Sequence, residues 1–524
     1  MTRPIAPPAA PRVQLLDLPN EALLNVIEHV GGNAGSIRST AASADPVRAA
    51  RDQARHALRA RASIPLINSF FRDMYYASLR TAKNAECGFL HTNGALARCA
   101  SLPEHEFAPR VKSVVDRSSH IEADLEAFSP AQVQTFLSAL RAKAATPGNT
   151  LRNLRLLTGE RDLVATEQFL GALRAAHGNH CPAIEWHCRF AGPEVTTPPD
   201  LRGYRELTAV RLQACQNLLD PPVFGDNPNL VSVEIGDATE MNRAPDFSGL
   251  PELAKVTLSR CLQLAVPPDF SRNTKLAHVR IQMCPLLQQP PVFGNNPELV
   301  LVDLGHCALT EPPDFSECKH LAILNLRGCG ELRTAPDLSC LENLEILKLD
   351  APAITVTPDL ENNAALKSLD LSGCVALTTQ LNLERNPGLV SLKLKGNPAA
   401  VVPLDFRDNP KLEDIDLSSC ADLTAPPDFG SNPALVSVNL SNCTALEAGP
   451  DFSNNPNLRS VQLQGCARLS SAPKFASYAS LAIVDIGGCA AIPPDQIREL
   501  REGLQARLRT RPPRHGQRGL PRPA

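Results

Sequence analysis

The chain has 524 residues, of which 43% are hydrophobic, and a formal net charge of -3 at pH 7. One ordinary core does not organise this length, so the sequence predicts several domains or an elongated repeat architecture. The small net charge excludes a global field that favours nucleic acid or an anionic membrane, and no apolar stretch reaches transmembrane length. We therefore expect a soluble protein that binds neither nucleic acid nor membranes.

A helical region is expected at residues 13–83, after a proline-rich leader at 1–12 that is too polar to fold and lacks the apolar core of a secretory signal. The first helix has an early proline and leucines on one face. Its pattern is LPxExLLxxI, made by Leu18, Pro19, Glu21, Leu23, Leu24 and Ile27. A second element, Ile67-Asn-Ser-Phe70-Phe71-Arg72, follows an insertion-like stretch at 31–45 that is rich in glycine, alanine and serine.

Both elements resemble the F-box family, and the pattern around Leu18 looks like the first F-box helix. The resemblance implies that the six pattern residues bind a Skp-type adaptor protein. The insertion falls where an F-box has a tight connection between helices. A plain helical cap for the repeats that follow is therefore the alternative.

Residues 84–206 predict an irregular, helix-containing flank of the repeats. Helices are expected at Ala131–Ala142 and Thr166–Ala176, and leucines at 151, 154 and 156 predict a strand before the second helix. A further strand is expected at Ile184–Phe190, where apolar and polar residues alternate.

A dense His/Cys cluster lies at this last strand and comprises His180, Cys181, His187 and Cys188. The alternation places His187 and Cys188 on opposite faces of the strand, which argues against convergence on a metal ion. The sequence also lacks the HExxH, GxSxG and GxxxxGK[ST] motifs, and no His and acid motif marks Cys87 or Cys99 as a nucleophile. We therefore expect no metal, no cofactor and no catalytic residue.

Residues 207–490 contain a unit of about 22 to 23 residues that recurs about twelve times and ends in a terminal strand. Its consensus is LxxVxLxxCxxLxxPPDFSxNPx. The period-two VxL and LxL cores predict short strands that stack into one parallel sheet. Prolines in the return path forbid a regular helix there, so the convex side is expected to be mostly non-helical.

Phenylalanines share one register and are expected to form a buried spine, with leucines substituting in three coils. The residues are Phe224, Phe247, Phe270, Phe293, Phe315, Leu338, Leu360, Leu383, Phe406, Phe429, Phe452 and Phe475.

Ten cysteines share another register: Cys215, Cys261, Cys284, Cys307, Cys329, Cys374, Cys420, Cys443, Cys466 and Cys489. Stacked coils align equivalent positions, so these thiols predict one internal column and a reducing compartment. Ala238 and Pro352 are expected to replace the cysteine in two coils. The pattern resembles the leucine-rich-repeat family, with the asparagine of LxxLxLxxN kept only at Asn397. This resemblance implies a curved α/β-repeat solenoid whose strand face is the concave binding surface.

The solenoid is expected to end in an amphipathic capping helix at 491–508, with Ile497, Leu500, Leu504 and Leu508 at helical spacing. Residues 509–524 are rich in arginine and proline and predict a disordered tail.

A target-binding patch is expected on the strand face. Most outward positions alternate in charge and can pair with each other, but three consecutive coils place apolar residues where solvent is expected. Basic residues adjoin these positions and can steer an acidic partner. The expected patch comprises Arg280, Leu301, Ile323, Arg327, Ile346 and Lys348.

An F-box-like region followed by leucine-rich repeats resembles the bacterial, type III secreted F-box/leucine-rich-repeat effectors. The resemblance implies a substrate-recognition adaptor of a cullin-type ubiquitin ligase, secreted by a bacterium into the host cytoplasm. Two alternatives stay open: a plain protein-interaction module with no ubiquitin role, and an enzyme with an unrecognised site in 84–206.

Overall fold

The computed structural model describes residues 94–146, 151–177, 183–397, 404–477 and 480–510. The six expected adaptor-binding residues, the leader and most of the tail lie outside these ranges. Two compact units are present: one ends at Arg189 and includes Glu206–Ala209, and the other comprises Phe190–Arg205 and the chain from Val210 onward. Within the described ranges, no helix combines the length and apolarity that a membrane crossing requires.

The first unit alternates helices with short parallel strands. Strand β1 pairs with β2 and β2 pairs with β3, in parallel. The two expected helices and the strand at Ile184–Phe190 are confirmed with longer bounds, and the earlier strand is present but begins after Leu151. The elements are α4 (Glu104–Arg117), β1 (His120–Asp124), η2 (Leu125–Ala127), α5 (Pro130–Ala145), β2 (Asn153–Thr158), η3 (Glu160–Asp162), α6 (Leu163–His177) and β3 (Ala183–Ala191).

Local signals explain these elements. Helix α5 begins at a capping box in which the Ser129 hydroxyl accepts from the Gln132 backbone N–H and the Gln132 side chain accepts from the Ser129 N–H. The fully buried Trp186 of β3 donates its indole N–H to the Thr158 hydroxyl of β2 at 2.8 Å. A buried indole needs such a partner, so this bond fixes how the two strands pack.

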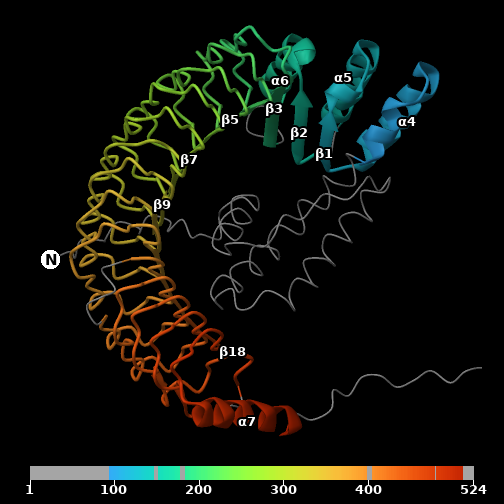
Figure 1. The fold of residues 1–524 in the computed structure, drawn as a ribbon. Helices are drawn as coiled ribbons and strands as arrows, with labels where there is room; N and C mark the ends of the chain where they lie inside the picture. Colours follow the sequence, from blue (N-terminus) through green and yellow to red (C-terminus); the bar gives the residue numbers. More distant parts are fainter. Residues whose placement is uncertain (1–93, 147–150, 178–182, 398–403, 478–479, 511–524) are drawn as a thin grey trace, which may run out of the picture. The chain divides into compact units, whose positions relative to one another are not determined.

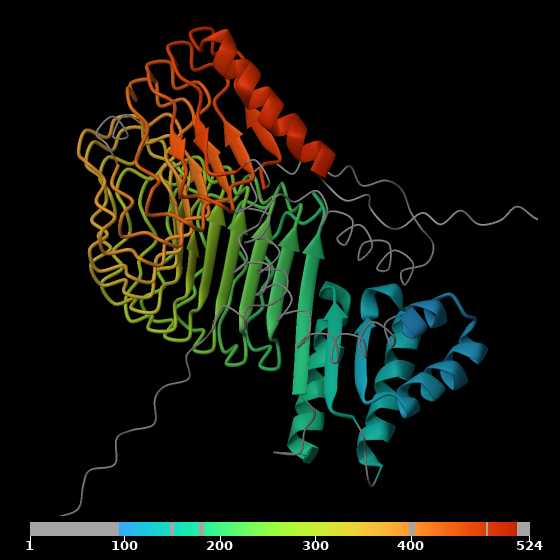
Figure 2. The same ribbon diagram turned by 90° about the horizontal axis from the view of Figure 1, so that it is seen from below.

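The second unit is a solenoid of stacked parallel strands, as expected. In the view of Figure 1 its strands lie along the inner side of an arc and irregular loops form the outer side, and Figure 2 shows the strands side by side. Each strand is hydrogen-bonded to its neighbours in chain order. The strands are β4 (Ala209–Gln213), β5 (Ser232–Gly236), β6 (Lys255–Ser259), β7 (His278–Gln282), β8 (Leu301–Asp303), β9 (Ile323–Leu326), β10 (Ile346–Leu349), β11 (Ser368–Asp370), β12 (Ser391–Lys393), β13 (Asp414–Asp416), β14 (Ser437–Asn439), β16 (Ser460–Gln462) and β18 (Ile483–Asp485).

The convex side is mostly irregular, as the prolines predict. Its strands in the described ranges are the two-residue pair β15 (Asp451–Phe452) and β17 (Lys474–Phe475), besides isolated bridges such as Asp269 with Val292.

The expected thiol column is confirmed, since all ten cysteines of that register are buried. Most of them donate to a backbone carbonyl of the preceding coil, as Cys443 does to Leu417 at 3.1 Å. One assignment was wrong: Ala351, fully buried, occupies the column where Pro352 was expected, and Pro352 is exposed. That coil is one residue shorter between its strand and the column position, a change that the consensus alignment did not allow for.

The expected phenylalanine spine is also confirmed, except that Phe224 and Phe475 at its two ends are only half-buried. Rings in neighbouring coils stack with centroids 5.2 to 6.3 Å apart, and Leu338, Leu360 and Leu383 are buried in the coils that lack the ring. Aromatic stacking therefore runs in two segments, separated by three leucine coils.

A third buried column, which the sequence analysis did not identify, consists of the asparagines of the return path. In each coil that carries this asparagine, the side-chain amide donates to two backbone carbonyls of the preceding coil, as Asn432 does to Phe406 and Asn409, both at 2.9 Å. This ladder holds the proline-rich loops in register, where no regular backbone pairing is available. Its members are Asn227, Asn273, Asn296, Asn363, Asn386, Asn409, Asn432 and Asn455.

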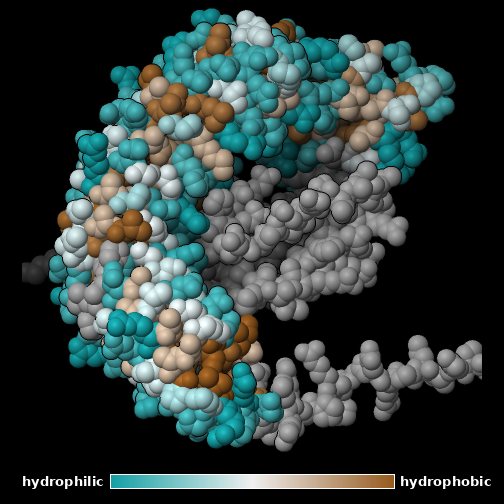
Figure 3. Space-filling view, in the orientation of Figure 1, coloured by the Kyte–Doolittle hydropathy of each residue, from teal (hydrophilic) through white to brown (hydrophobic). Residues whose placement is uncertain are grey.

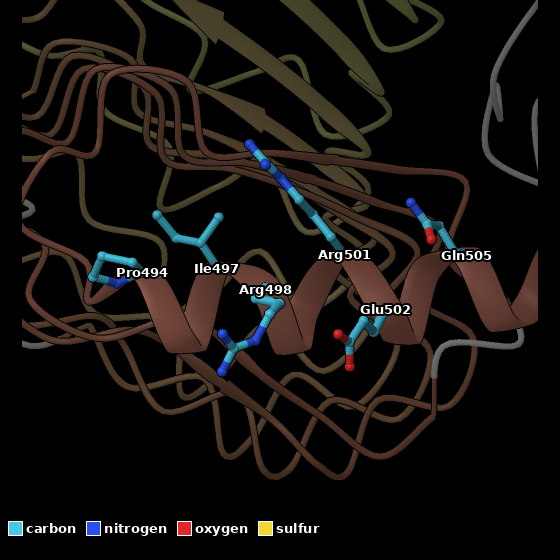
Figure 4. Close-up of a pocket in the computed structure, with 6 residues that line it drawn as sticks. All are labelled: Pro494, Ile497, Arg498, Arg501, Glu502 and Gln505. Atoms are coloured by element: carbon cyan, nitrogen blue, oxygen red, sulfur yellow. The ribbon is translucent and has the colours of Figure 1, made fainter.

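The expected capping helix is confirmed as α7 (Pro494–Thr510), which buries Leu500. A pocket of about 480 Å³ runs along this helix and is lined by Pro494, Ile497, Arg498, Arg501, Glu502 and Gln505 (Figure 4). Because every lining residue belongs to one helix, the pocket is a groove along α7 and not an enclosed site.

Candidate functional site

The strand face of the second unit carries two outward columns of side chains, which the strand pairings align residue by residue. We call them the first and the second column. The first column runs Ser232, Lys255, His278, Leu301, Ile323, Ile346, Ser368, Ser391, Asp414, Ser437, Ser460 and Ile483. The second column runs Glu234, Thr257, Arg280, Asp303, Asn325, Lys348, Asp370, Lys393, Asp416, Asn439, Gln462 and Asp485.

The apolar part of the first column is not an open patch. Leu301, Ile323 and Ile346 are only 3%, 6% and 1% exposed, so the expectation of exposure was wrong. Alternation along a strand gives the direction of a side chain but not what surrounds it. Ile483, on β18, is 52% exposed and is the large apolar residue of this column that solvent reaches.

Elsewhere on the second unit, the exposed large apolar residues of the described ranges lie outside the concave sheet. Examples are Val223, Val266 and Val292. Figure 3 shows apolar residues in small, separated groups on the outer surface of the solenoid. Groups of this kind are common on protein surfaces and do not by themselves define a binding site.

Acidic residues of the second column are engaged within the solenoid. The Asp303 carboxylate accepts from the Gln282 amide at 2.6 Å, the Asn325 amide at 2.8 Å and the Gly305 backbone N–H at 3.2 Å. The guanidinium Nε of Arg280 lies 3.7 Å from the same carboxylate.

Further along the column, Asp and Asn side chains accept from the backbone N–H two residues later, closing the turn after each strand. The pairs are Asn325 with Arg327, Asp370 with Ser372, Asp416 with Ser418, Asn439 with Ser441, and Asp485 with Gly487.

Lys348 differs from its neighbours in the second column. It is 8% exposed, and no hydrogen bond or ion pair joins its ammonium to another residue of the described ranges. Burial lowers the pKa of Lys348 to about 8, against the opposing effect of Asp370 and Asp303. Arg327, just after β9, is exposed.

Two further ionisable groups of the first column are desolvated. Burial lowers the pKa of His278 to about 4, helped by Lys255 and Arg280, and its Nε2 is buried without a hydrogen-bond partner. Burial raises the pKa of Asp414 to about 7, helped by Glu413. Perturbed ionisable groups therefore gather on this face.

In the first unit, burial likewise lowers the pKa of His187 and raises that of Glu206. Burial raises the pKa of the Cys188 thiol to about 12 and raises that of Cys99, which disfavours the thiolate that a nucleophile requires. His180, Cys181 and Cys87 lie outside the described ranges, within which no group of three potential metal ligands converges.

Sequence reasoning missed the engagement of the acidic residues. The sequence did contain a pattern typical of such turns. At the end of five strands, an Asp or Asn is followed two residues later by Ser or Gly. Burial of Lys348 and His278 had no such signal, because it depends on the three-dimensional surroundings of each side chain.

Neither a model of a known protein family nor a curated protein matches the sequence. Among solved structures, the chain is similar to the leucine-rich-repeat domain of the type III effector XopL, with 18% identity over 50% of this chain and 83% of that domain and a TM-score of 0.28. It is also similar to a leucine-rich-repeat protein of Leptospira interrogans, with 12% identity over 76% of this chain and 96% of that one and a TM-score of 0.36. Neither likeness supports a statement about function.

Proposed function

We propose that the concave face around β7–β10 binds a target protein and that the chain is a substrate-recognition adaptor of a cullin-type ubiquitin ligase. Solenoids of stacked repeats use their concave surfaces for binding. The observation that supports a site there is the presence of two desolvated ionisable groups, His278 on β7 and Lys348 on β10. Desolvated charged groups lower the stability of the folded state. Groups of this kind cluster at functional sites.

Within this face, Arg280, Arg327 and Lys348 supply the polar contacts to the target in our proposal. Leu301, Ile323 and Ile346 form the buried apolar floor beside them. Arg327 is the accessible member, so it sets the rate of encounter with the target, whereas Lys348 and Arg280 set the lifetime of the complex.

To test this face, proteins captured from a host lysate by the full-length chain are compared with those captured by the double variant Arg327→Glu, Lys348→Glu. The matched control is Arg243→Glu, an exposed residue outside the concave sheet whose guanidinium lies 3.0 Å from Asp220. We expect specific captured proteins to be lost from the double variant and kept by the control. Equal capture by both variants would remove the target site from this face.

The adaptor role is supported by the LPxExLLxxI pattern at Leu18 to Ile27 and by its position ahead of the repeats. In an effector of this kind the chain would act in the host cytoplasm after secretion by a bacterium. Purified Skp-type adaptor is expected to bind the full-length chain and to lose affinity for the double variant Leu18→Ala, Pro19→Ala. The control Asn20→Ala changes a residue between the pattern positions and is expected to retain binding.

A plain interaction module without a ubiquitin role is the alternative. It is favoured if the chain loses its targets on substitution of the concave face but never binds the Skp-type adaptor. The two experiments therefore test the two halves of the proposal separately.

A further inference from the structure

Around Lys348, several hydrogen-bond acceptors are engaged while nearby donors lack a partner in the described ranges. Several acceptors there are engaged, because Asp303 receives three hydrogen bonds, the Asn325 oxygen accepts from the Arg327 N–H, and one Asp370 oxygen accepts from the Ser372 N–H. The Asn325 amide is also used, since it donates to Asp303.

Donors remain unused. The ammonium of Lys348 contacts no acceptor in the described ranges. The Nε of Arg280 is buried without a hydrogen-bond partner, although Asp303 lies 3.7 Å away. On β7, the Nε2 of His278 is likewise buried and unpartnered, and it is a donor in one of the two tautomers of the neutral ring. A molecule that completes this surface must therefore bring acceptors.

A second buried lysine shows that the fold can satisfy such a group. Lys143 on α5 is 6% exposed, close to the 8% of Lys348, and its ammonium donates to the Asp116 carbonyl at 2.9 Å. Loss of part of an ammonium's hydration without a compensating hydrogen bond lowers the stability of the folded state. Lys348 is thus a cost to folding that a bound anionic group would remove.

We propose that Lys348 anchors an acidic side chain of the target, so that the partner is a protein presenting carboxylates to β7–β10. This inference rests on the proposed function of the concave face. A single carboxylate fits better than a phosphate, because Asp303 and Asp370 lie near the lysine and repel a denser negative charge. Arg280, three strands away in the same column, suits a second carboxylate about 14 Å from the first.

The first measurement uses the purified full-length chain alone. Lys348→Met is expected to raise the melting temperature by several degrees at pH 7, because it replaces an unpaired cation with an apolar side chain of similar length. The matched variant Lys143→Met removes a hydrogen-bonded lysine of equal burial and is expected to lower the melting temperature. A fall with Lys348→Met would show that the lysine stabilises the fold and would overturn the inference.

The second measurement selects ten-residue peptides from a random displayed library on the full-length chain. We expect enriched peptides to carry Asp or Glu and the corresponding synthetic peptides to bind Lys348→Met about ten- to hundredfold more weakly, the loss of one charge-assisted contact. Replacing the acidic residue by its amide should cause a similar loss. Enrichment of neutral or basic peptides, or equal binding to Lys348→Met, would overturn the inference.

A pH series separates charge from packing. Asp303 on β8, Arg327 after β9, Asp370 on β11 and Lys393 on β12 face this lysine, and its ammonium loses its proton more readily than an exposed one. Binding of an acidic peptide should therefore weaken above pH 8, and Lys348→Arg should remove that dependence because guanidinium stays charged.

The outcomes distinguish the two proposals. If peptide binding ignores Lys348 but is lost with Arg327→Glu, the concave site stands and the acidic anchor falls. If both variants bind every selected peptide as the native chain does, the concave site falls as well.

Discussion

The asparagine ladder gives the sharpest stability prediction, and Asn432 is its most informative member. Asn432→Ala removes the hydrogen bonds to the carbonyls of Phe406 and Asn409, both 2.9 Å long. Each carbonyl keeps a second donor, since Asn409 N–H binds Phe406 O and Leu412 N–H binds Asn409 O. The loss is therefore two net hydrogen bonds at about 1 kcal/mol each, about 2 kcal/mol in total, without the larger cost of a fully orphaned carbonyl.

Asn432→Asp keeps the shape of the side chain but replaces the amide donor with an acceptor. A carboxylate cannot donate, so it would place negative charge against two carbonyl oxygens in a fully buried position. We expect a loss above 3 kcal/mol at pH 7, larger than that of Asn432→Ala, and partial recovery as the acid is protonated at lower pH. The measurement is the free energy of unfolding from urea titrations of the full-length chain.

The control for both changes is Asn457, an exposed asparagine whose amide donates to the Pro433 carbonyl at 3.1 Å. Its Ala and Asp variants should stay within about 0.5 kcal/mol of the native chain. If Asn432→Asp costs no more than Asn432→Ala, the amide is not acting as a donor and the ladder has been assigned the wrong role.

Three further predictions concern other columns. Met283 has φ of 55° and a side chain that is 48% exposed, so Met283→Gly should stabilise the chain by about 0.5–1 kcal/mol in the same urea titrations. The pKa of Asp414 in the folded state, about 7, exceeds its ordinary value of 3.8, so the stability it contributes is lost as pH rises from about 4 through 7. Asp414→Asn should therefore raise the melting temperature at pH 8 and not at pH 4, whereas Asp416→Asn, which alters the acceptor for the Ser418 N–H, should bring no such gain at pH 8. Phe429→Ala removes a ring stacked on both neighbours and should cost about 3–5 kcal/mol, whereas Phe224→Ala, at the partly exposed end of the stack, should cost less.

The sequence predicted the interior of the solenoid well because stacking repeats one environment in every coil. A position that is buried once is buried in each coil, so the cysteine and phenylalanine registers could be inferred by alignment alone. Alignment failed at Ala351 because a one-residue deletion shifts the loop relative to the consensus while the strand keeps its place. A register based on residue number does not detect such a shift.

The asparagine column was equally regular in the sequence, yet its role was not inferred. Asparagine before proline is typical of a turn, so the sequence analysis did not consider that its side chain could be buried and donate hydrogen bonds. Two coils offered a clue, since valine replaces aspartate before phenylalanine in them: the Gly225 and Gly294 N–H groups donate to the oxygens of Asn227 and Asn296. In the coils with Asp at the preceding position, that carboxylate accepts the corresponding N–H instead, as Asp269 does from Ser271.

The concave face was predicted less well for a physical reason. Direction follows from the period of the strand, whereas exposure depends on curvature and on whatever lies over the sheet. Ile323 and Ile483 occupy the same column, yet they are 6% and 52% exposed. The interactions of the charged residues could not be predicted from the sequence either. Neighbouring side chains donate hydrogen bonds to Asp303, whereas Lys348 has no hydrogen-bond partner in the described ranges.

Each coil contains positions that hold the solenoid together and positions that do not, and binding specificity can depend on the second kind. Thiols, rings and asparagine amides hold neighbouring coils together from the interior and the return path, and the Asp and Asn residues at the strand ends close the turns. The remaining positions of the two outward columns have no such role in every coil, so their side chains can change without loss of the solenoid. Lys348 lies at one of these positions, where it is desolvated and has no hydrogen-bond or ion-pair partner in the described ranges. A side chain that the fold does not require and that burial penalises is best explained by what it binds.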